Sequence, residues 1–369
     1  MENEYVITVD LKNTKDESRR KVIEFTCSSG YHDPVNEAYG PATDAFFCGT
    51  VSQKMLKDWY GLTPLNKPAV LVHYGDKVDN AFWFKSAVMI GDGFESFYPL
   101  CNLDTLAHEL GHGVTETYSD LVYEKQSGGM NEAFSDIMGE SAEEFFSTTD
   151  WLSGFQDTKD PIRPLRYFDK PSRDGQSIDH ANQYKADLNV HLSSGVYNRA
   201  FYQIVKVGGV KMRYGFEAYL TANRVYWNSN SNFVSGACGV IRAAYTLGLD
   251  TEKFKAGFSV VGISTCDLTS YLRMLTTSQS QSNIKVSRIR QPVFGVTLTA
   301  SVSSITVTTT GGSGIKVAIS TSLSRDSSLA NGAGSVTWAT GGTTGIVYVR
   351  LFTDSETGQT GVSVSLSMN

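Results

Sequence analysis

The sequence of 369 residues lacks any apolar run of the roughly eighteen residues that a membrane-spanning helix requires. It also lacks an excess of basic residues, since 32 Lys and Arg stand against 38 Asp and Glu and give a net charge of -6. Nucleic acids and anionic membranes attract clustered Lys and Arg. We therefore expect no membrane span and no nucleic-acid partner. The first residues, MENEYVITVD, contain no apolar core of a signal peptide.

Cysteine is scarce, and no two cysteines form a C-x-x-C pair, which excludes the usual zinc knuckle. One or two disulfides remain open, and an odd number leaves at least one thiol unpaired within the chain. The five cysteines are Cys27, Cys48, Cys101, Cys238 and Cys266.

The composition, 41% hydrophobic and 11% aromatic, predicts a globular protein whose length exceeds one hydrophobic core. Residues 5–100 alternate short β-rich runs with turns, whereas 103–265 show helical periodicity, and Ser, Thr, Gly and Val dominate from about 290. We predict a β-rich lobe over 1–118, a helical lobe over 119–268, a linker over 269–289 and a small antiparallel β-sandwich over 290–369. The run TTSQSQSN (276–283) has the composition of a linker.

The stretch LDTLAHELGHGVTE, residues 103–116, carries two of the six histidines. Its apolar residues recur at helical spacing and predict a helix over 103–118. His108 and His112 then lie on one face, about 6 Å apart at their roots, which suits two nitrogens that share a metal ion. Glu109 lies one position round the helix, beside such an ion.

A second helix is predicted over 131–147, within GGMNEAFSDIMGESAEEFF. One of its faces is apolar, and the other carries four carboxylates at helical spacing. Like charges at that spacing repel by about 0.2–0.5 kcal/mol per exposed pair, so the stripe indicates bound cations. The four residues are Glu132, Asp136, Glu140 and Glu143.

Antiparallel packing of the two helices would bring Glu132 to His108 and His112. Two imidazoles and one carboxylate with an open position are typical of catalytic zinc. Asp136 would accept the remaining N–H of a ligand histidine, and Glu109 would take a proton from the zinc-bound water. The plainer alternatives are an H-E-x-x-H pattern that arose by chance and a carboxylate of Asp136 that lies at the surface.

At the other end of the helix pair, Asp104 would meet Glu140 and Glu143. An all-oxygen set of this kind suits calcium. The rise of about 1.5 Å per residue places the two ions about 10 to 14 Å apart.

Five motifs now occur in one order: DNAFW at 79–83, HELGHGVTE, SGGMNEAFSDIMGE, LRYFDKPSRDG at 165–175 and VHLSSGVYNRAFY at 190–202. With these motifs the chain resembles the thermolysin family of zinc neutral metalloendopeptidases, in its vibriolysin and pseudolysin branch, from about Tyr5 to Cys266. The resemblance implies an α+β two-lobe zincin fold with the active-site cleft between the lobes, followed here by the sandwich. It also implies one catalytic Zn²⁺ and one structural Ca²⁺.

The zinc ligands that the resemblance implies are His108, His112 and Glu132. Glu109 would be the general base that activates the zinc-bound water, while Tyr123 and His191 would donate hydrogen bonds to the oxyanion. Taken alone, Tyr123 is more simply a packing aromatic and His191 a core histidine.

The family resemblance also implies how a peptide substrate would bind. Arg166 would hydrogen-bond a substrate carbonyl, and Asn80 with the backbone of Ala81 would hold the extended peptide as an added strand. The pocket for the residue after the cleaved bond prefers large apolar side chains, and its walls would be Phe97, Leu100 and Leu165.

Further implied features are a calcium site, a disulfide and secretion. The disulfide, Cys238–Cys266, favours an oxidising compartment. We expect a secreted monomer that acts on proteins or peptides, with a pro-segment and the first strands of the family upstream of Met1. Cys27, Cys48 and Cys101 have no assigned pairing. The calcium ligands would be Asp104, Glu140, Glu143, Asp150 and the carbonyl of Leu152.

Two positions depart from the family pattern. Asn189 stands where the branch usually has an acid two residues before the oxyanion histidine, which leaves the charge of His191 open unless Asp187 substitutes. Thr105 replaces a common valine in the apolar pocket.

A different class of function competes with the peptidase: an adhesion or binding protein with an impaired catalytic lobe, whose sandwich binds an extracellular polymer. Trp338 and Tyr348 would be a contact surface in that case, although alternating aromatics in a short strand are more often core.

Overall fold

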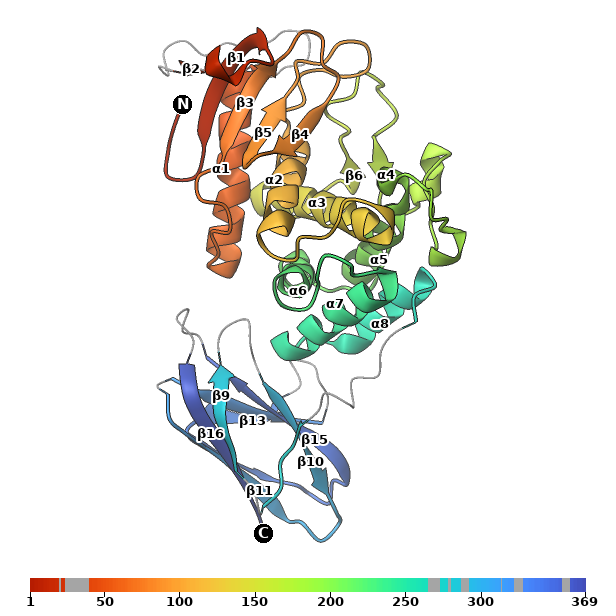
Figure 1. Cartoon of the computed structure of the whole chain (residues 1–369). Helices are drawn as coiled ribbons and strands as arrows, with labels where there is room; N and C mark the ends of the chain where they lie inside the picture. Colours follow the sequence, from red (N-terminus) through yellow and green to blue (C-terminus); the bar gives the residue numbers. More distant parts are fainter. Residues whose placement is uncertain are drawn as a thin grey trace. The chain divides into compact units, whose positions relative to one another are not determined.

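The computed structural model describes residues 1–19, 21–23, 40–264, 273–277, 280–286, 292–312, 314–321, 328–353 and 359–369. The chain forms two compact units (Figure 1). One comprises Met1–Ala237 with Ala256–Ser264, and the other comprises Cys238–Lys255 with Thr265–Asn369. No described helix is long and apolar enough to cross a membrane.

A mixed five-stranded sheet forms the start of the first unit, in the order β2-β1-β3-β5-β4. β1, β3 and β5 run parallel, and β4 pairs antiparallel with β5 and is left at the edge. Helix α1 (Pro41–Tyr60) packs against β1 and β3. The strands are β1 (Ile7–Thr14), β2 (Lys21–Val22), β3 (Ala69–Tyr74), β4 (Ala81–Phe84) and β5 (Ala87–Ile90).

Two long helices, α2 (Leu103–Thr117) and α3 (Lys125–Phe146), lie side by side beyond this sheet (Figure 1). A Cβ atom added to Gly111 would lie 2.8 Å from Ser135 Cα, and one added to Gly139 would lie 2.8 Å from the carbonyl oxygen of Asp104. Glycine on each helix therefore permits the close approach that brings their polar faces together. α3 begins earlier than the predicted residue 131, because burial of the Gly128–Gly129 pair overrides its low helix propensity.

The rest of the first unit is mainly helical, as the sequence predicts. It includes α4 (Val190–Ser193), α5 (Gly195–Tyr202) and a π-helix over Gln203–Val207. α6 spans Met212–Val225, and α7 (Phe233–Leu247) and α8 (Thr251–Val260) give residues to both units. β6 (Leu152–Ser153) pairs with β7 (Arg166–Tyr167), and short 3-10 helices span Glu17–Arg19, Pro171–Asp174 and Ala181–Gln183.

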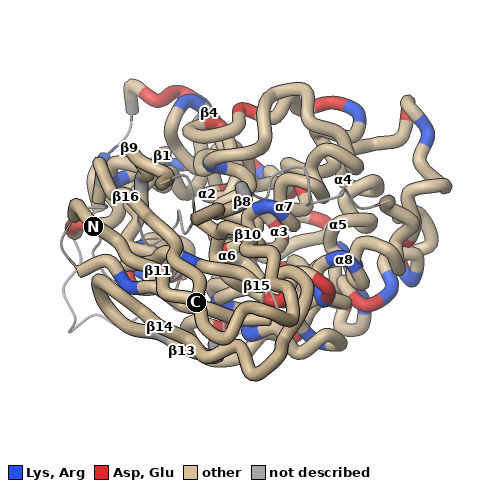
Figure 2. The backbone as a smooth tube through the Cα atoms, turned by 90° about the horizontal axis from the view of Figure 1, so that it is seen from below, with Lys and Arg blue, Asp and Glu red and all other residues tan. Residues whose placement is uncertain are grey.

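The second unit contains the predicted sandwich. Its sheets have the orders β13-β12-β15-β10-β8 and β14-β11-β16-β9. Among the residues that the structure describes, eighteen buried apolar side chains form the core, including Val317, Val347 and Val349, and Trp338 packs against it, as its alternation predicts. Figure 2 shows no charged residues along β11, β13 and β14. The main strands are β10 (Val293–Leu298), β11 (Ser304–Thr310), β12 (Lys316–Ser320), β13 (Ser328–Ala333), β14 (Ser335–Ala339), β15 (Gly345–Phe352) and β16 (Gln359–Met368).

The linker prediction over 269–289 is wrong for two of its segments. β8 (Arg273–Met274) pairs with β10, and β9 (Gln281–Val286) pairs with β16, so both belong to the sandwich. The sequence of β9, QSNIKV, is largely polar and therefore did not indicate a strand. Its Ile284 and Val286 belong to the sandwich core. The division of the first unit into lobes at residue 118 stays a prediction.

Candidate metal centre

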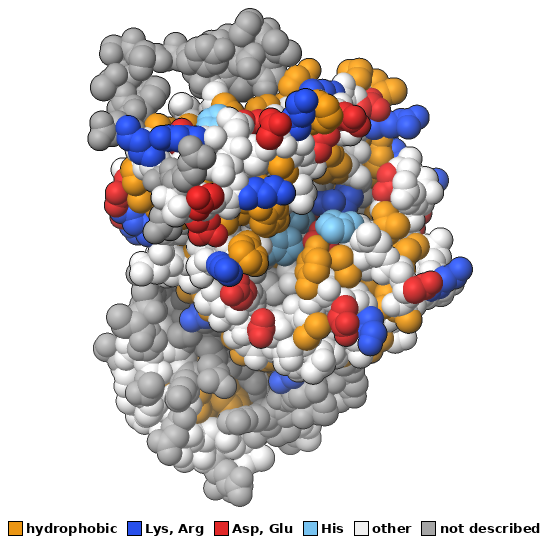
Figure 3. Space-filling model, turned by 45° about the horizontal axis from the view of Figure 1, so that its top comes forward, with side chains coloured by type: hydrophobic (Ala, Val, Ile, Leu, Met, Phe, Trp, Pro, Cys, Tyr) orange, Lys and Arg blue, Asp and Glu red, His pale blue; other side chains and the backbone are white. Residues whose placement is uncertain are grey.

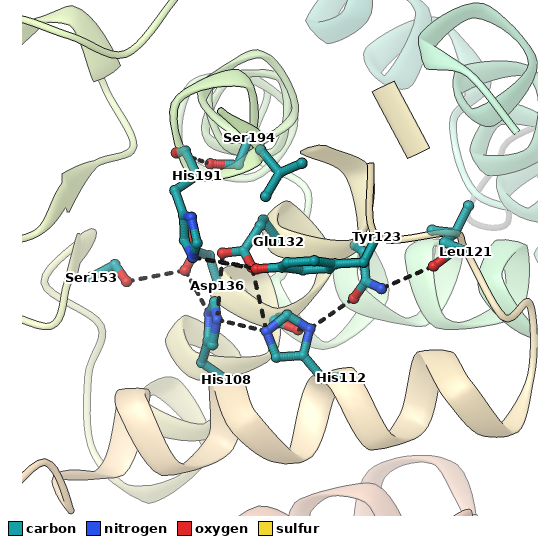
Figure 4. A network of polar contacts seen from close by, with 12 residues as sticks. His108, His112, Leu121, Tyr123, Glu132, Asp136, Ser153, His191 and Ser194 are labelled. Atoms are coloured by element: carbon teal, nitrogen blue, oxygen red, sulfur yellow. Dashed lines mark hydrogen bonds and ion pairs between the residues drawn. The ribbon is translucent and has the colours of Figure 1, made fainter. Parts of the chain in front are cut away.

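Two imidazoles meet on α2. The Nε2 atoms of His108 and His112 are 3.1 Å apart, and their rings are nearly perpendicular, at 86°. Both side chains project from one face of α2 toward α3 (Figure 4). The helix is held at its start by Asn102, whose side chain accepts a hydrogen bond from the Thr105 N–H at 2.9 Å.

Glu132 of α3 completes the group. Its Oε2 lies 3.6 Å from His108 Nε2, and its Oε1 lies 3.5 Å from His112 Nε2. Donor atoms around a tetrahedral zinc ion are separated by about 3.3–3.6 Å, so the three side chains fit one ion. Glu132 is fully buried, and its Oε2 finds no hydrogen-bond partner among the described residues. A buried carboxylate oxygen without a donor, facing two imidazole nitrogens, fits a cation.

The other nitrogen of each ring binds an oxygen of α3. His108 Nδ1 lies 2.7 Å from Asp136 Oδ1, and His112 Nδ1 lies 2.8 Å from Asn131 Oδ1 (Figure 4). Both Nε2 atoms are therefore left facing the space between the two histidines and Glu132, where a metal ion would bind. The role predicted for Asp136 agrees with this geometry. The sequence prediction missed Asn131, which directly precedes Glu132 in the chain.

Asp136 is also the centre of a buried polar network. It accepts hydrogen bonds from Arg166 Nε at 2.7 Å and Nη2 at 2.6 Å, from Asn198 Nδ2 at 2.7 Å and from Ser153 Oγ at 3.1 Å. Although burial opposes the charged form, the charges of Arg166 and His108 hold the pKa of Asp136 far below its usual range. Arg166, predicted to bind substrate, thus has a structural partner as well.

Burial and neighbouring charges act in opposite directions at His108 and Glu132. Burial disfavours the charged imidazolium, yet Asp136 and Glu132 raise the pKa of His108 to about 9. Burial likewise opposes the Glu132 carboxylate, but the histidines around it lower its pKa. A ligand histidine must be neutral, so a divalent cation would displace the proton of His108.

Tyr123 and His191 lie on the open side of this group. The Tyr123 hydroxyl donates to Glu132 Oε1, and burial with the Glu132 charge raises the pKa of Tyr123 well above its usual value. His191 Nε2 lies 3.3 Å from the Tyr123 hydroxyl and 3.5 Å from Glu132 Oε1. Both side chains are about half exposed, Tyr123 as a residue at 51% and His191 as a side chain at 50%. Neither is therefore a buried packing residue.

Asn189 holds His191 in place. Its Oδ1 accepts from the His191 backbone N–H at 2.9 Å and lies 2.9 Å from the ring Nδ1. When Nδ1 donates to this amide oxygen, Nε2 carries a hydrogen only if the ring is charged. Burial lowers the pKa of His191, which the Glu132 charge partly offsets, and a neutral Asn189 adds no charge of its own.

A cavity of about 670 Å³ opens onto the metal-ligating group. Figure 3 shows histidine side chains within a hollow on this face, bordered by hydrophobic and charged side chains. Glu109 lines the cavity beside the ligands. The structure brings all the predicted substrate-binding residues to the same cavity, together with Thr105: Asn80, Ala81, Phe97, Leu100, Leu165 and Arg166.

A second acidic group lies at the other end of the helix pair. Ligand atoms of Glu140, Glu143 and Asp150 all lie within 4.8 Å of one another. Burial raises the pKa of Glu143 to about 9, and Glu140 Oε1 and Glu143 Oε2 find no hydrogen-bond partner among the described residues. Asp104, whose pKa burial raises to about 6, instead accepts from the Thr105 N–H at 2.6 Å. This set fits a hard cation, and the calcium site stays a prediction.

The predicted disulfide cannot be followed to both ends, since Cys266, like Cys27, lies outside the described residues. Cys48 and Cys101 are buried thiols, and burial raises the pKa of each well above its usual value. Cys101, shortly before α2, is thus a small buried residue of the core.

The H-E-x-x-H helix and its carboxylate partner place the chain among the zinc metallopeptidases. The models "Thermolysin metallopeptidase, catalytic domain" and "Thermolysin metallopeptidase, alpha-helical domain" match residues 1–116 and 119–263. The chain belongs to the thermolysin family of metallopeptidases, as its motifs predict.

Individual relatives agree with the family models. The chain is 43% identical over 323 residues to the "Neutral protease" of Vibrio proteolyticus, covering 85% of this chain and 52% of that protein. It is 44% identical over 200 residues to a "Zinc metalloprotease" of Helicobacter pylori, covering 53% of this chain and 77% of the relative. The chain spans about half the length of several curated relatives it matches.

Among solved structures, the precursor of protealysin, a metalloproteinase from Serratia proteamaculans, matches with a TM-score of 0.60 at 23% identity. The match covers 70% of this chain and 88% of that one, and it supports the fold.

Proposed function

We propose that this chain is a secreted zinc endopeptidase that hydrolyses internal peptide bonds. The observation that carries the proposal is the buried Glu132 carboxylate, which faces the Nε2 atoms of His108 and His112. Its Oε2 finds no donor among the described residues. Bound zinc would polarise the scissile carbonyl and lower the pKa of water.

Other side chains around the proposed zinc site would transfer the proton, stabilise the oxyanion and orient the ligands. Glu109 lines the cavity beside the ligands and would accept the proton of the attacking water. The Tyr123 hydroxyl and a protonated His191 Nε2 would donate to the carbonyl oxygen as it gains negative charge. Asp136 and Asn131 hold the two imidazoles with Nε2 toward the gap.

Substrate would bind as an extended strand along the edge of β4. Asn80 and the Ala81 backbone would hydrogen-bond its main chain, and Arg166 would reach a carbonyl with the part of its guanidinium that does not bind Asp136. The side chain after the cleaved bond would enter the apolar part of the cavity. We propose a preference for bulky apolar residues there, with walls formed by Phe97, Leu100 and Leu165.

We extend the proposal to the parts of the chain away from the zinc ligands. A calcium ion would bind the carboxylates of Glu140, Glu143 and Asp150, of which Glu140 is buried, with Asp104 and the Leu152 carbonyl as further ligands. A Cys238–Cys266 disulfide and a monomeric state accompany the proposal of secretion. The sandwich would be an accessory domain of the peptidase.

Chelation tests the proposal most simply. Treatment with 1,10-phenanthroline, with calcium present throughout, should abolish casein hydrolysis, and added zinc should restore it. A matched Glu109→Gln variant should bind zinc and remain inactive. Hydrolysis by zinc-free protein would exclude a zinc mechanism. A zinc-loaded protein that cleaves no protein would favour the binding or adhesion function instead.

A further inference from the structure

The substrate cavity carries uncompensated negative charge at one end. Glu116 and Asp120 line it beyond the zinc ligands, and both are exposed to solvent. The one Lys or Arg among the described residues that line the cavity is Arg166, and its guanidinium binds Asp136. Neither Glu116 nor Asp120 forms an ion pair with a described residue, and Lys85 and Arg224 lie over the rings of Phe84 and Tyr118.

The same end of the cavity is the C-terminus of α2, which adds to the negative potential. Glu116 occupies the last turn of α2, where a helix favours a basic residue because its final carbonyl groups carry partial negative charge. No basic residue occurs in that turn. An acidic residue there opposes helix stability, and such local conflicts concentrate at functional sites.

An aromatic side chain completes the arrangement. Trp83 of β4 donates its indole N–H to Glu116 Oε2 at 2.5 Å and lines the same cavity. Its ring lies close against the backbone of α2, since a Cβ atom added to Gly113 would lie 2.6 Å from Trp83 Cζ2. A fixed aromatic ring beside carboxylates suits the alkyl stem and cationic head of a basic side chain.

Helix geometry indicates which substrate residues would lie beside Glu116. Glu116 lies about 9 Å along α2 from the midpoint of His108 and His112, at about 1.5 Å per residue. An extended peptide covers that distance in two to three residues, at about 3.3 Å each. The apolar pocket near Thr105 lies toward the opposite end of α2, so Glu116 faces the part of the substrate before the cleaved bond.

We propose that Trp83, Glu116 and Asp120 form a subsite that selects Lys or Arg two or three residues before the cleaved bond. The inference rests on the proposed peptidase function and adds a substrate class to it: peptides with a basic residue upstream and a bulky apolar residue directly after the cleaved bond. Each carboxylate acts on the substrate side chain through charge, and Trp83 acts through its ring face.

The test uses the zinc-loaded full chain and quenched fluorescent peptides that differ at one position. All carry Leu after the cleaved bond and Lys, Gln or Glu at the second or third position before it. We expect kcat/KM to be about fivefold higher for Lys than for Gln, as one exposed charge pair provides, and lowest for Glu. The preference should shrink as NaCl rises from about 20 mM to about 0.5 M.

Variants assign the preference to these residues. The double variant Glu116→Gln, Asp120→Asn should lose the preference, so that the ratio of its kcat/KM values for the Lys and Gln peptides falls to about one. Glu116→Gln keeps an acceptor for the Trp83 indole, so the ring stays in place. Glu124→Gln is the matched control: Glu124 pairs with Lys125 at 3.6 Å, does not line the cavity, and should leave the preference intact.

The outcomes separate this inference from the proposed function. The proposed subsite is wrong if the wild type cleaves the Lys and Gln peptides equally, or if the double variant keeps the preference for Lys. Neither result would contradict the proposed peptidase function. A zinc-loaded wild type that cleaves none of the peptides overturns both.

Discussion

The α3 helix and the sandwich core are both buried, but they differ in the side chains that they bury: carboxylates in α3 and apolar groups in the sandwich. Glu132, Asp136 and Glu140 of α3 are carboxylates with at most 2% of their surface exposed. The sandwich core cluster, among the residues described there, consists of apolar side chains. Hydroxyl pairs such as Thr306–Thr337 lie on the exposed face of neighbouring strands, and the two oxygens of this pair are 2.8 Å apart.

The difference shows what each region is built to do. A buried carboxylate costs several kcal/mol unless a cation or hydrogen bonds compensate it, so α3 must be completed by partners: Arg166 at Asp136 and, we propose, metal ions at Glu132 and Glu140. The described residues of the sandwich core cluster need no metal ion, because burial of apolar side chains stabilises them. Substitutions in α2 and α3 should therefore affect metal binding and catalysis, whereas those in the sandwich should affect folding.

The largest expected effect is on catalysis. Glu109→Gln removes the proposed general base while keeping a side chain of the same shape, and kcat/KM should fall about 10³-fold. Zinc content and thermal stability should stay at wild-type values, which distinguishes this loss from that of a ligand variant such as His108→Ala. A zinc-loaded Glu109→Gln protein with wild-type activity would show that Glu109 is not the general base.

Asp136→Ala tests the buried network. It leaves the Arg166 guanidinium buried without its partner, and we expect a loss of about 3–5 kcal/mol in the free energy of unfolding. Zinc affinity should also fall about 10- to 100-fold, because His108 loses the acceptor that orients it. Chemical denaturation and zinc titration measure the two effects. Asp58→Ala, at an exposed ion pair with Lys54, is the control and should change neither.

A substitution in the sandwich tests the other side of the comparison. Val349→Ala creates a cavity at a fully buried position and should cost about 2 kcal/mol in the stability of the second unit, measured by denaturation. Zinc binding should not change. Thr337→Ala, on the exposed face, should cost a few tenths of a kcal/mol, roughly 0.2–0.5. A Val349→Ala protein with altered zinc binding would contradict the separation of roles.

The smallest effect is a pH dependence at His73, whose Nδ1 lies 2.8 Å from Asp92 Oδ1. The hydrogen bond to Asp92 raises the pKa of His73 above its ordinary value, so the pair stabilises the fold fully below about pH 6.5 and less as pH rises through the raised pKa. The side chain is partly exposed, so we expect under about 1 kcal/mol.

His73→Asn provides the comparison, because Asn tolerates the positive φ of 57° at this position. The stability difference from wild type should be larger at pH 5.5 than at pH 8.5. A difference that does not change with pH would show that the pair contributes no charge interaction.

Much of the metal centre could be predicted because helix spacing is local. The four-residue spacing of His108 and His112 predicts that they share one face of a helix. The carboxylates at helical spacing predict that Glu132 and Asp136 share a face of the partner helix. α2 ends at Thr117, within one residue of the predicted helix. Asn131 was missed because an amide next to a ligand has no distinctive spacing of its own.

Contacts between distant segments were harder to foresee. The pairing of Arg166 with Asp136 joins β7 to α3, and no periodicity links the two. β13 has the sequence SLANGA, with no clear alternation, and pairs with β12 through the tertiary fold. In both cases the structure depends on packing between elements that the sequence pattern does not connect.

The central claim is that His108, His112 and Glu132 bind one zinc ion. Anomalous X-ray diffraction at the zinc absorption edge tests it most directly. We predict one strong peak per chain, about 2.0–2.2 Å from Nε2 of His108, Nε2 of His112 and a carboxylate oxygen of Glu132. An empty site in zinc-saturated crystals, or a zinc peak bound by other residues, would contradict the account.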